Sequence, residues 1–209
     1  MAKGTRHRIM DTARALFNEK GYGAVTNEVL SEALGIATGN IWYHFHTQRD
    51  LLDALSEEFL NDINERLMIR PSEDGDVIEE YAALLVSMAA EFRRHRFLYR
   101  DQTDFGEFTE TLKTAIPDLF NRTIEQFVAF YRAMIANGLF VWEEDTLRDL
   151  TAAVVILLRY SLEYRREMDL LDNRAEGAVR EGISLHLSLI EHRLVPEAAA
   201  YLRAALNAA

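Results

Sequence analysis

The stretch GIATGNIWYHF, Gly35–Phe45, decides how the rest of this sequence is interpreted. It follows an apolar segment, begins with a glycine, and places a threonine, an asparagine, a histidine and aromatic residues within about one and a half helical turns. Ile41 and Phe45 are four residues apart, so they can point inward from one face of a short helix. The polar and aromatic side chains then remain outside, and the flanking sequence has to explain that outer face.

The flanking sequence predicts a helix on each side of a tight turn. A first helix spans Arg6–Lys20, and Thr26 is a suitable N-cap for a second, which carries Leu30 on its apolar face. Gly35 can end that second helix in the left-handed conformation, and a third helix begins near Thr38. Two short helices that meet at a tight turn, braced by a preceding helix, form a helix-turn-helix, whose second helix enters the major groove of DNA.

The remainder of the chain also shows helical periodicity, without a strand pattern or internal repeat. Thr47 and Asp50 form a predicted capping box at the start of a fourth helix, and RPSEDGD, residues 70–76, is the clearest linker. Further helices are expected over Val77–Arg94, after Tyr99, over Pro117–Asn137 with Pro117 in the first turn, over Thr146–Met168, over Arg174–Arg193 behind an Asn173/Glu176 cap, and from Pro196. The prediction is an all-α fold of about nine or ten helices: a three-helix helix-turn-helix head, residues 1–48, on a helical effector and dimerisation body, residues 49–209.

Composition narrows the possible functions. The 209 residues contain no cysteine, which excludes a disulfide framework and cysteine-ligated zinc and suits a reducing cytoplasm. The net charge of −11 argues against nucleic acid as a partner, but residues 1–56 contain equal numbers of basic and acidic residues, and Lys3, Arg6 and Arg8 gather near the N-terminus. No signal peptide or membrane span is recognisable, so we expect a cytoplasmic protein without a membrane partner.

Enzyme motifs are missing from the sequence. The six histidines form no paired Glu-x-x-His motif and no His-Glu-x-x-His motif, and no glycine-rich phosphate loop occurs. We therefore predict no catalytic residue, no metal and no cofactor. A helical-bundle enzyme and a helical interaction protein that does not bind DNA remain the alternatives to a DNA-binding protein.

The outer face of the third helix carries groups that suit DNA. Asn40 can bond adenine with both ends of its amide, Thr38 can contact a thymine methyl or a phosphate, and Gly39 permits close backbone approach. Tyr43 and His44 can donate to phosphate oxygens. We expect Phe45 in the core, Trp42 largely so although it is also a candidate DNA contact, and Tyr43 exposed. The Arg6–Arg8 cluster either contacts DNA or is a solvated tail.

Residues Arg8–Leu55 resemble the DNA-binding head of the TetR family of bacterial transcriptional regulators. The resemblance is carried by Ala13, Leu16, Phe17, the Gly21-Tyr22 pair, Thr26, the Ala33–Ile36 turn, Gly39, Ile41, Tyr43, His44, Phe45 and Leu51-Leu52. It implies a homodimer, a palindromic operator, a ligand-responsive body and repression rather than activation. It also implies that Thr26, Asn27, Thr38, Asn40, Tyr43 and His44 face DNA. Gln48 departs from the family pattern, because it stands where a lysine usually contacts phosphate, and we include it among the candidate DNA contacts.

Two long helices of the body are candidates for the dimer interface. Residues 150–167 are apolar on more than one stripe, which indicates burial on several sides, and the last long helix carries small residues that allow close approach. We expect these helices to pair with their symmetry mates, as the resemblance also implies. The predicted interface residues are Leu150, Val154, Leu158, Ile183, Leu187 and Ile190.

Arg159 points to an effector site, because it interrupts the most apolar helix of the chain. It either forms an ion pair with Glu163, Asp101 or Asp104, or its guanidinium reaches a cavity or solvent. On the second interpretation it lines a pocket for a small hydrophobic or amphipathic effector. The candidate pocket residues are Phe92, Tyr99, Phe105, Phe127, Tyr131, Arg159, Tyr160 and Glu163.

Overall fold

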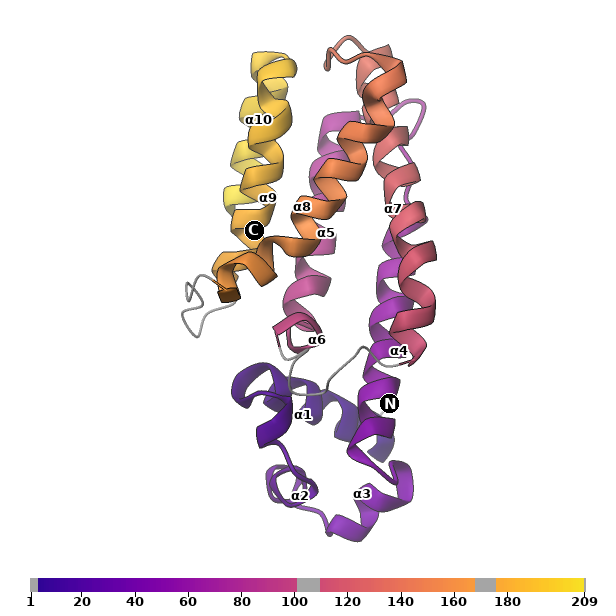
Figure 1. Ribbon diagram of the computed structural model, residues 1–209, viewed down its shortest axis with the longest axis vertical. Coiled ribbons are helices and arrows are strands. Elements are labelled where there is room, and N and C mark those ends of the chain that lie inside the picture. Colours follow the sequence, from indigo (N-terminus) through magenta and orange to yellow (C-terminus); the bar gives the residue numbers. More distant parts are fainter. Residues whose placement is uncertain (1–3, 101–109, 168–175, 209) are drawn as a thin grey trace. The chain divides into compact units, whose positions relative to one another are not determined.

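The computed structural model describes the backbone of residues 4–100, 110–167 and 176–208. It also describes their side chains, except those of residues 99–100, 159, 162–163, 165–167, 176–181 and 208. These residues form ten α-helices (Figure 1). Their bounds are α1 Thr5–Lys20, α2 Asn27–Leu34, α3 Thr38–His44, α4 Gln48–Leu67, α5 Val77–Arg94, α6 Phe97–Arg100, α7 Glu110–Ala136, α8 Leu147–Glu167, α9 Glu176–Ile190 and α10 Pro196–Ala208. The all-α prediction is confirmed.

The helices belong to two compact units. The head unit consists of residues Met1–Asp62 and Arg94–Ile116, and the body unit consists of Ile63–Arg93 and Pro117–Ala209. Helix α4 contributes residues to both. The head unit therefore includes a segment from the middle of the sequence in addition to the N-terminal helices.

The core of the head unit is built from the apolar faces that periodicity predicts. Ile9, Ala13 and Phe17 of α1 are fully buried, as are Leu30 of α2 and Ile41 of α3. The Phe17 ring packs against the rings of Tyr22 and Phe97, with centroids 5.2 and 5.3 Å away. These ring contacts join α1 to the turn that follows it and to α6.

Local capping signals set the ends of the head helices. Gly35 has φ +64°, the left-handed conformation that ends α2, and Thr26 accepts a hydrogen bond from the main-chain N–H of Val29 at 3.4 Å. At α4, the Thr47 N–H donates to the Asp50 carboxylate at 2.9 Å, and the Asp50 N–H donates to the Thr47 hydroxyl at 3.0 Å. This reciprocal pair confirms the predicted capping box.

The body unit packs α5, α7, α8, α9 and α10 around a core rich in aromatic rings. Its fully buried side chains include Tyr81, Phe127, Phe130, Tyr131 and Phe140. Gly138, with φ +69°, follows the end of α7, and an isolated bridge pairs Phe140 with Leu194. The loop after α7 is thereby tied to the segment before α10.

Two helix starts differ from the sequence-based expectation. Pro117 was expected in a first turn, but α7 begins at Glu110 and contains Pro117 in its interior. Leu112 in the turns before the proline is buried, so its packing holds those turns although Pro117 has no N–H to donate. The short helix expected after Tyr99 begins earlier, at Phe97, because Phe97 and Leu98 are both buried. Asn173 and the side chain of Glu176, which were expected to form a cap, lie outside what the structure describes.

Candidate nucleic-acid interface

Helix α3 is buried on one face and exposed on the other. Ile41 is fully buried and Phe45, its C-cap, is 4% exposed, whereas Tyr43 is 81% exposed. Gly39 and Asn40 are also exposed, near the start of the helix. Trp42 was expected largely in the core but is 49% exposed, because Ile41 and Phe45 already fill the inward face. The outer face therefore presents an amide, a phenol and an indole together.

The remaining predicted contacts lie around this face. Thr26 is exposed at the start of α2, and Asn27 is half-buried beside it. Thr38 is half-buried and its hydroxyl donates to the Ser31 hydroxyl at 3.4 Å, which links α3 to α2. His44 is half-buried, with its ring edge-on to that of Tyr43 at 5.1 Å.

Gln48 has a different environment from that of a phosphate contact. Its Nε2 donates to the main-chain oxygens of Tyr22 and Val25, at 2.9 and 2.8 Å. Both hydrogens of the amide are used, so none is left to donate to a phosphate. We therefore remove Gln48 from the candidate DNA contacts and assign it the role of fixing the turn between α1 and α2.

The N-terminal basic cluster is only partly a solvated tail. The guanidinium of Arg6 lies 5.0 Å from the centre of the Phe45 ring, and its Nη1 donates to the sulfur of Met10 at 3.3 Å. Arg8 is exposed. Arg6 thus packs beside the C-terminal end of α3, whereas Arg8 is exposed to solvent.

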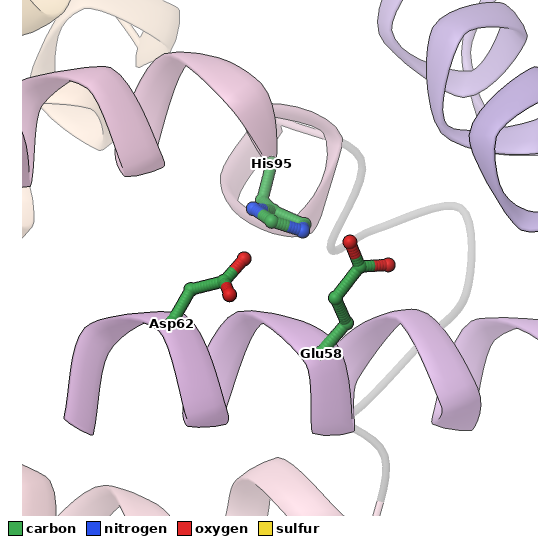
Figure 2. Close-up of side chains that lie close together, drawn as sticks. All are labelled: Glu58, Asp62 and His95. Atoms are coloured by element: carbon green, nitrogen blue, oxygen red, sulfur yellow. The ribbon is translucent and has the colours of Figure 1, made fainter. Parts of the chain in front are cut away.

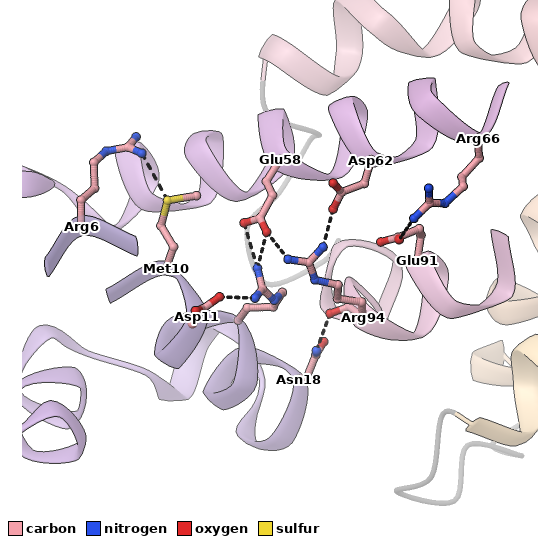
Figure 3. A network of polar contacts seen from close by, with 10 residues as sticks. Arg6, Met10, Asp11, Asn18, Glu58, Asp62, Arg66, Glu91 and Arg94 are labelled. Carbon is pink, nitrogen blue, oxygen red and sulfur yellow. Dashed lines mark hydrogen bonds and ion pairs between the residues drawn. The ribbon is translucent and has the colours of Figure 1, made fainter. Parts of the chain in front are cut away.

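An ion-pair network joins α1, α4 and the end of α5 within the head unit (Figure 3). Nη1 of Arg14 donates to both carboxylate oxygens of Glu58, at 2.7 and 2.8 Å. Arg94 pairs with the same Glu58 and, at 2.5 Å, with Asp62. Arg14 and Glu58 are 11% and 15% exposed, so this network is better shielded from water than an ordinary surface ion pair.

Asn18 adds a second connection from α1 to the turn between α5 and α6. Its side-chain N–H donates to the Arg94 carbonyl at 2.7 Å, and its side-chain oxygen accepts from the Phe97 N–H at 3.1 Å. Arg96 donates to the Asn18 main-chain oxygen at 2.8 Å. Sequence reasoning did not find this connection, because the partners are more than 75 residues apart.

Glu58, Asp62 and His95 come together in a way that also suits a cation (Figure 2). One ligand atom from each lies within 4.8 Å of the others. Both carboxylates are, however, already paired with guanidinium groups, which neutralise them in place of a metal. We therefore assign the cluster to the ion-pair network.

The predicted effector residues are only partly described. Phe127 and Tyr131 are fully buried in the body unit, and Phe92 is half-buried in α5. Tyr160 is 57% exposed on α8, so it does not line an enclosed pocket within the chain. The side chains of Tyr99, Phe105, Arg159 and Glu163 lie outside the described ones, so both interpretations of Arg159 stay open.

The predicted interface residues are mostly covered within the chain. Val154, Ile183, Leu187 and Ile190 are at most 8% exposed, and Leu150 and Leu158 are half-buried. The exposed apolar residues of these helices lie elsewhere: Ile156, Tyr160 and Tyr164 on α8, and Leu185 and Leu189 on α9. We call these five residues the α8–α9 apolar face. Their spacing of four places each set on one stripe of its helix.

Helix α3 exposes polar and aromatic side chains on one face, and its other face is buried, as are the apolar faces of α1 and α2. This arrangement defines a helix-turn-helix head of the DNA-binding class. Comparison with known proteins agrees. The family described as "Bacterial regulatory proteins, tetR family" matches residues 9–55, and the one described as "Bacterial transcriptional repressor" (TetR) matches residues 58–202. The chain belongs to the TetR family of bacterial transcriptional regulators.

Relatives found by sequence match part of the chain, and a solved structure matches nearly all of it in fold. The tetracycline repressor protein class C of Escherichia coli is 36% identical over 101 residues, 48% of this chain and 43% of that protein. The repressor KstR2 of Rhodococcus jostii (strain RHA1) is 33% identical over 60 residues, 29% of each chain. This chain thus covers less than half of either relative. A TetR-family regulator from Marinobacter aquaeolei VT8 has the same fold, with TM-score 0.78, 21% identity and 98% of both chains covered.

Proposed function

We propose that this protein is a repressor that binds a palindromic DNA operator as a homodimer and is released by a small hydrophobic or amphipathic molecule. The observation that carries the proposal is the exposed face of α3, on which Asn40, Trp42 and Tyr43 stand outward from a fully buried Ile41. The major groove accepts a helix of this size and offers partners to all three groups.

Each candidate contact has a role that follows from its place. Asn40 reads a base, with adenine as its natural partner, and Gly39 lets the start of α3 approach the DNA closely. Thr26, Asn27, Thr38, Tyr43 and His44 are proposed to contact phosphates or sugars and so fix the register of the head. The exposed Trp42 supplies apolar contact, for example with a thymine methyl group.

The α8–α9 apolar face is the surface that we propose the second subunit covers. Its five members are between 38% and 57% exposed, and an apolar stripe on each of two adjacent helices is favourable to cover. A two-fold dimer would place both pairs of helices in one interface. The residues already buried within the chain support this face from behind. In the described part of the chain, no helix is long and apolar enough to cross a membrane.

A selection from a random DNA duplex library tests the proposal. The expected result is an enriched palindrome whose half-site centres are about 34–36 Å apart, or a multiple of that spacing. On the selected operator, Asn40→Ala should cost about 1–3 kcal/mol, while binding to random duplex changes little. Asn137→Ala, at an exposed asparagine of the body unit, is the matched control. A library without any enriched sequence at low salt would reject DNA binding and favour a helical interaction protein.

A further inference from the structure

Three neutral polar side chains meet in a hydrogen-bonded triangle inside the body unit. They are Tyr81 of α5, Tyr131 of α7 and His186 of α9, and all three are fully buried. The Tyr81 hydroxyl lies 3.1 Å from the Tyr131 hydroxyl and 3.0 Å from Nε2 of His186. The Tyr131 hydroxyl lies 2.9 Å from the same nitrogen. Three helices that are distant in sequence therefore deliver polar groups to one point.

Aromatic rings surround the triangle. Phe127 stands edge-on to Tyr81 and to His186, with centroids 5.7 and 6.0 Å away, and Phe140 lies 5.4 Å from Tyr131. In such surroundings a charge is costly. Burial lowers the pKa of His186 to about 3 and raises the pKa of Tyr81 well above its usual value. All three members are therefore uncharged at neutral pH.

Counting hydrogens identifies the favoured form of the His186 ring. If the ring hydrogen is on Nδ1, Tyr131 donates to Nε2 and Tyr81 donates to Tyr131, so both hydroxyl hydrogens are used. If the ring hydrogen is on Nε2, that hydrogen and one hydroxyl hydrogen are paired, but the other hydroxyl hydrogen has no acceptor at the triangle and Nδ1 becomes a buried acceptor without a donor. Both arrangements make two hydrogen bonds. The first leaves one strong hydrogen-bonding group unpaired, the Nδ1–H, whereas the second leaves a hydroxyl hydrogen and a ring nitrogen unpaired, so we assign the hydrogen to Nδ1.

That assignment leaves a donor to be explained. Nδ1 of His186 is buried and has no hydrogen-bond partner among the described residues. Buried donors are nearly always paired, and an unpaired one lowers stability. Replacing the triangle with apolar side chains would avoid that loss. A buried donor without a partner, beside the aromatic rings of Phe127 and Phe140, points to a ligand that supplies the acceptor.

We propose that the Tyr81–Tyr131–His186 triangle is the polar end of the effector site, and that the effector is a small neutral molecule whose carbonyl or ether oxygen accepts a hydrogen bond from Nδ1 of His186. This inference rests on the proposed function, in which a ligand controls the protein. Phe127 and Phe140 would contact the apolar body of the ligand. A carboxylate is disfavoured because the triangle supplies no positive charge. Since the triangle is closed in this structure, the site opens as the ligand enters.

A matched pair of probes tests the proposal: acetophenone, which carries a carbonyl, and ethylbenzene, which has similar size and no acceptor. Trp142 is the reporter, because it stacks on Phe140 with centroids 5.8 Å apart. The full chain with Trp42→Phe has Trp142 as its single tryptophan. We expect saturable quenching by acetophenone, with an affinity about 5- to 150-fold higher than that of ethylbenzene.

Variants then test the role of His186. In His186→Leu the preference for acetophenone should disappear, and in His192→Leu, an exposed histidine, it should persist. If His186→Leu does not fold, wild-type protein with ¹⁵N-labelled histidine replaces it: acetophenone should shift the ring resonances of His186 and not those of His192. No acetophenone binding, equal affinity for the two probes, or a preference that survives in His186→Leu would overturn the proposal. Operator binding, measured separately, distinguishes these failures from failure of the proposed function.

Discussion

Acidification should destabilise this protein through His186 by an amount that the structure predicts. The ring has a pKa of about 3 in the folded chain, because it is fully buried, against about 6.5 in an unfolded chain. Between these two values the unfolded chain binds one more proton than the folded chain. Stability contributed by this group is therefore complete above pH 6.5 and falls as the pH decreases.

The size of the effect follows from the same two values. One pKa unit corresponds to about 1.4 kcal/mol, so acidification from pH 7 to pH 5 should remove about 2 kcal/mol of unfolding free energy through His186 alone. Tyr81 and Tyr131, which face the ring, remain protonated throughout this range. All other groups are the same in wild type and in a His186 variant, so the difference between the two proteins isolates the contribution of His186.

The assay is urea unfolding at pH 7, 6 and 5, at one fixed protein concentration so that dimer dissociation contributes equally. His186→Gln has no titrating group at this position and should lose about 2 kcal/mol less than wild type between pH 7 and pH 5. His192→Gln, at an exposed histidine, should follow wild type. Identical losses in wild type and His186→Gln would show that His186 is accessible to protons in the folded state, and would refute the reasoning.

Three further perturbations address the assembly and the head unit. Leu185→Glu, in the α8–α9 apolar face, should give folded monomers in sedimentation experiments. Leu187→Glu should instead unfold the chain, because Leu187 is already buried within it. A Leu185→Glu variant that remains dimeric would place the interface elsewhere. Glu58→Gln removes the carboxylate that Arg14 and Arg94 share, although Arg14 keeps Asp11 and Arg94 keeps Asp62 as partners. It should cost about 1–2 kcal/mol in thermal or urea unfolding, while Glu144→Gln, in an exposed pair with Arg132, should have little effect; equal costs would contradict the shielding of the network. Gln48→Ala should lower the free energy of unfolding by about 1–3 kcal/mol, because two hydrogen bonds to main-chain oxygens are lost. The salt dependence of operator binding should stay unchanged; a shallower salt dependence would show that Gln48 contacts phosphate.

Signals that act between near neighbours in the sequence were interpreted correctly. The Thr47–Asp50 capping box, the left-handed Gly35 and the inward pair Ile41 and Phe45 all depend on residues within one or two turns. These local rules place the helices of the head and define the outer face of α3. The sequence by itself therefore determined the all-α class and the position of the candidate DNA-reading helix.

Choices between faces and partners needed the tertiary structure. Periodicity shows that α8 and α9 are apolar on several sides, but it does not tell which stripe the chain itself covers, so Leu187 was assigned to the interface and Leu185 was not. The interior position of Pro117 depends on packing by Leu112. Gln48, the Asn18 connection and the Tyr81–Tyr131–His186 triangle join residues 23 to 105 positions apart. Hydrogen bonds over such separations leave no periodic trace in the sequence, because they depend on how whole helices pack against one another.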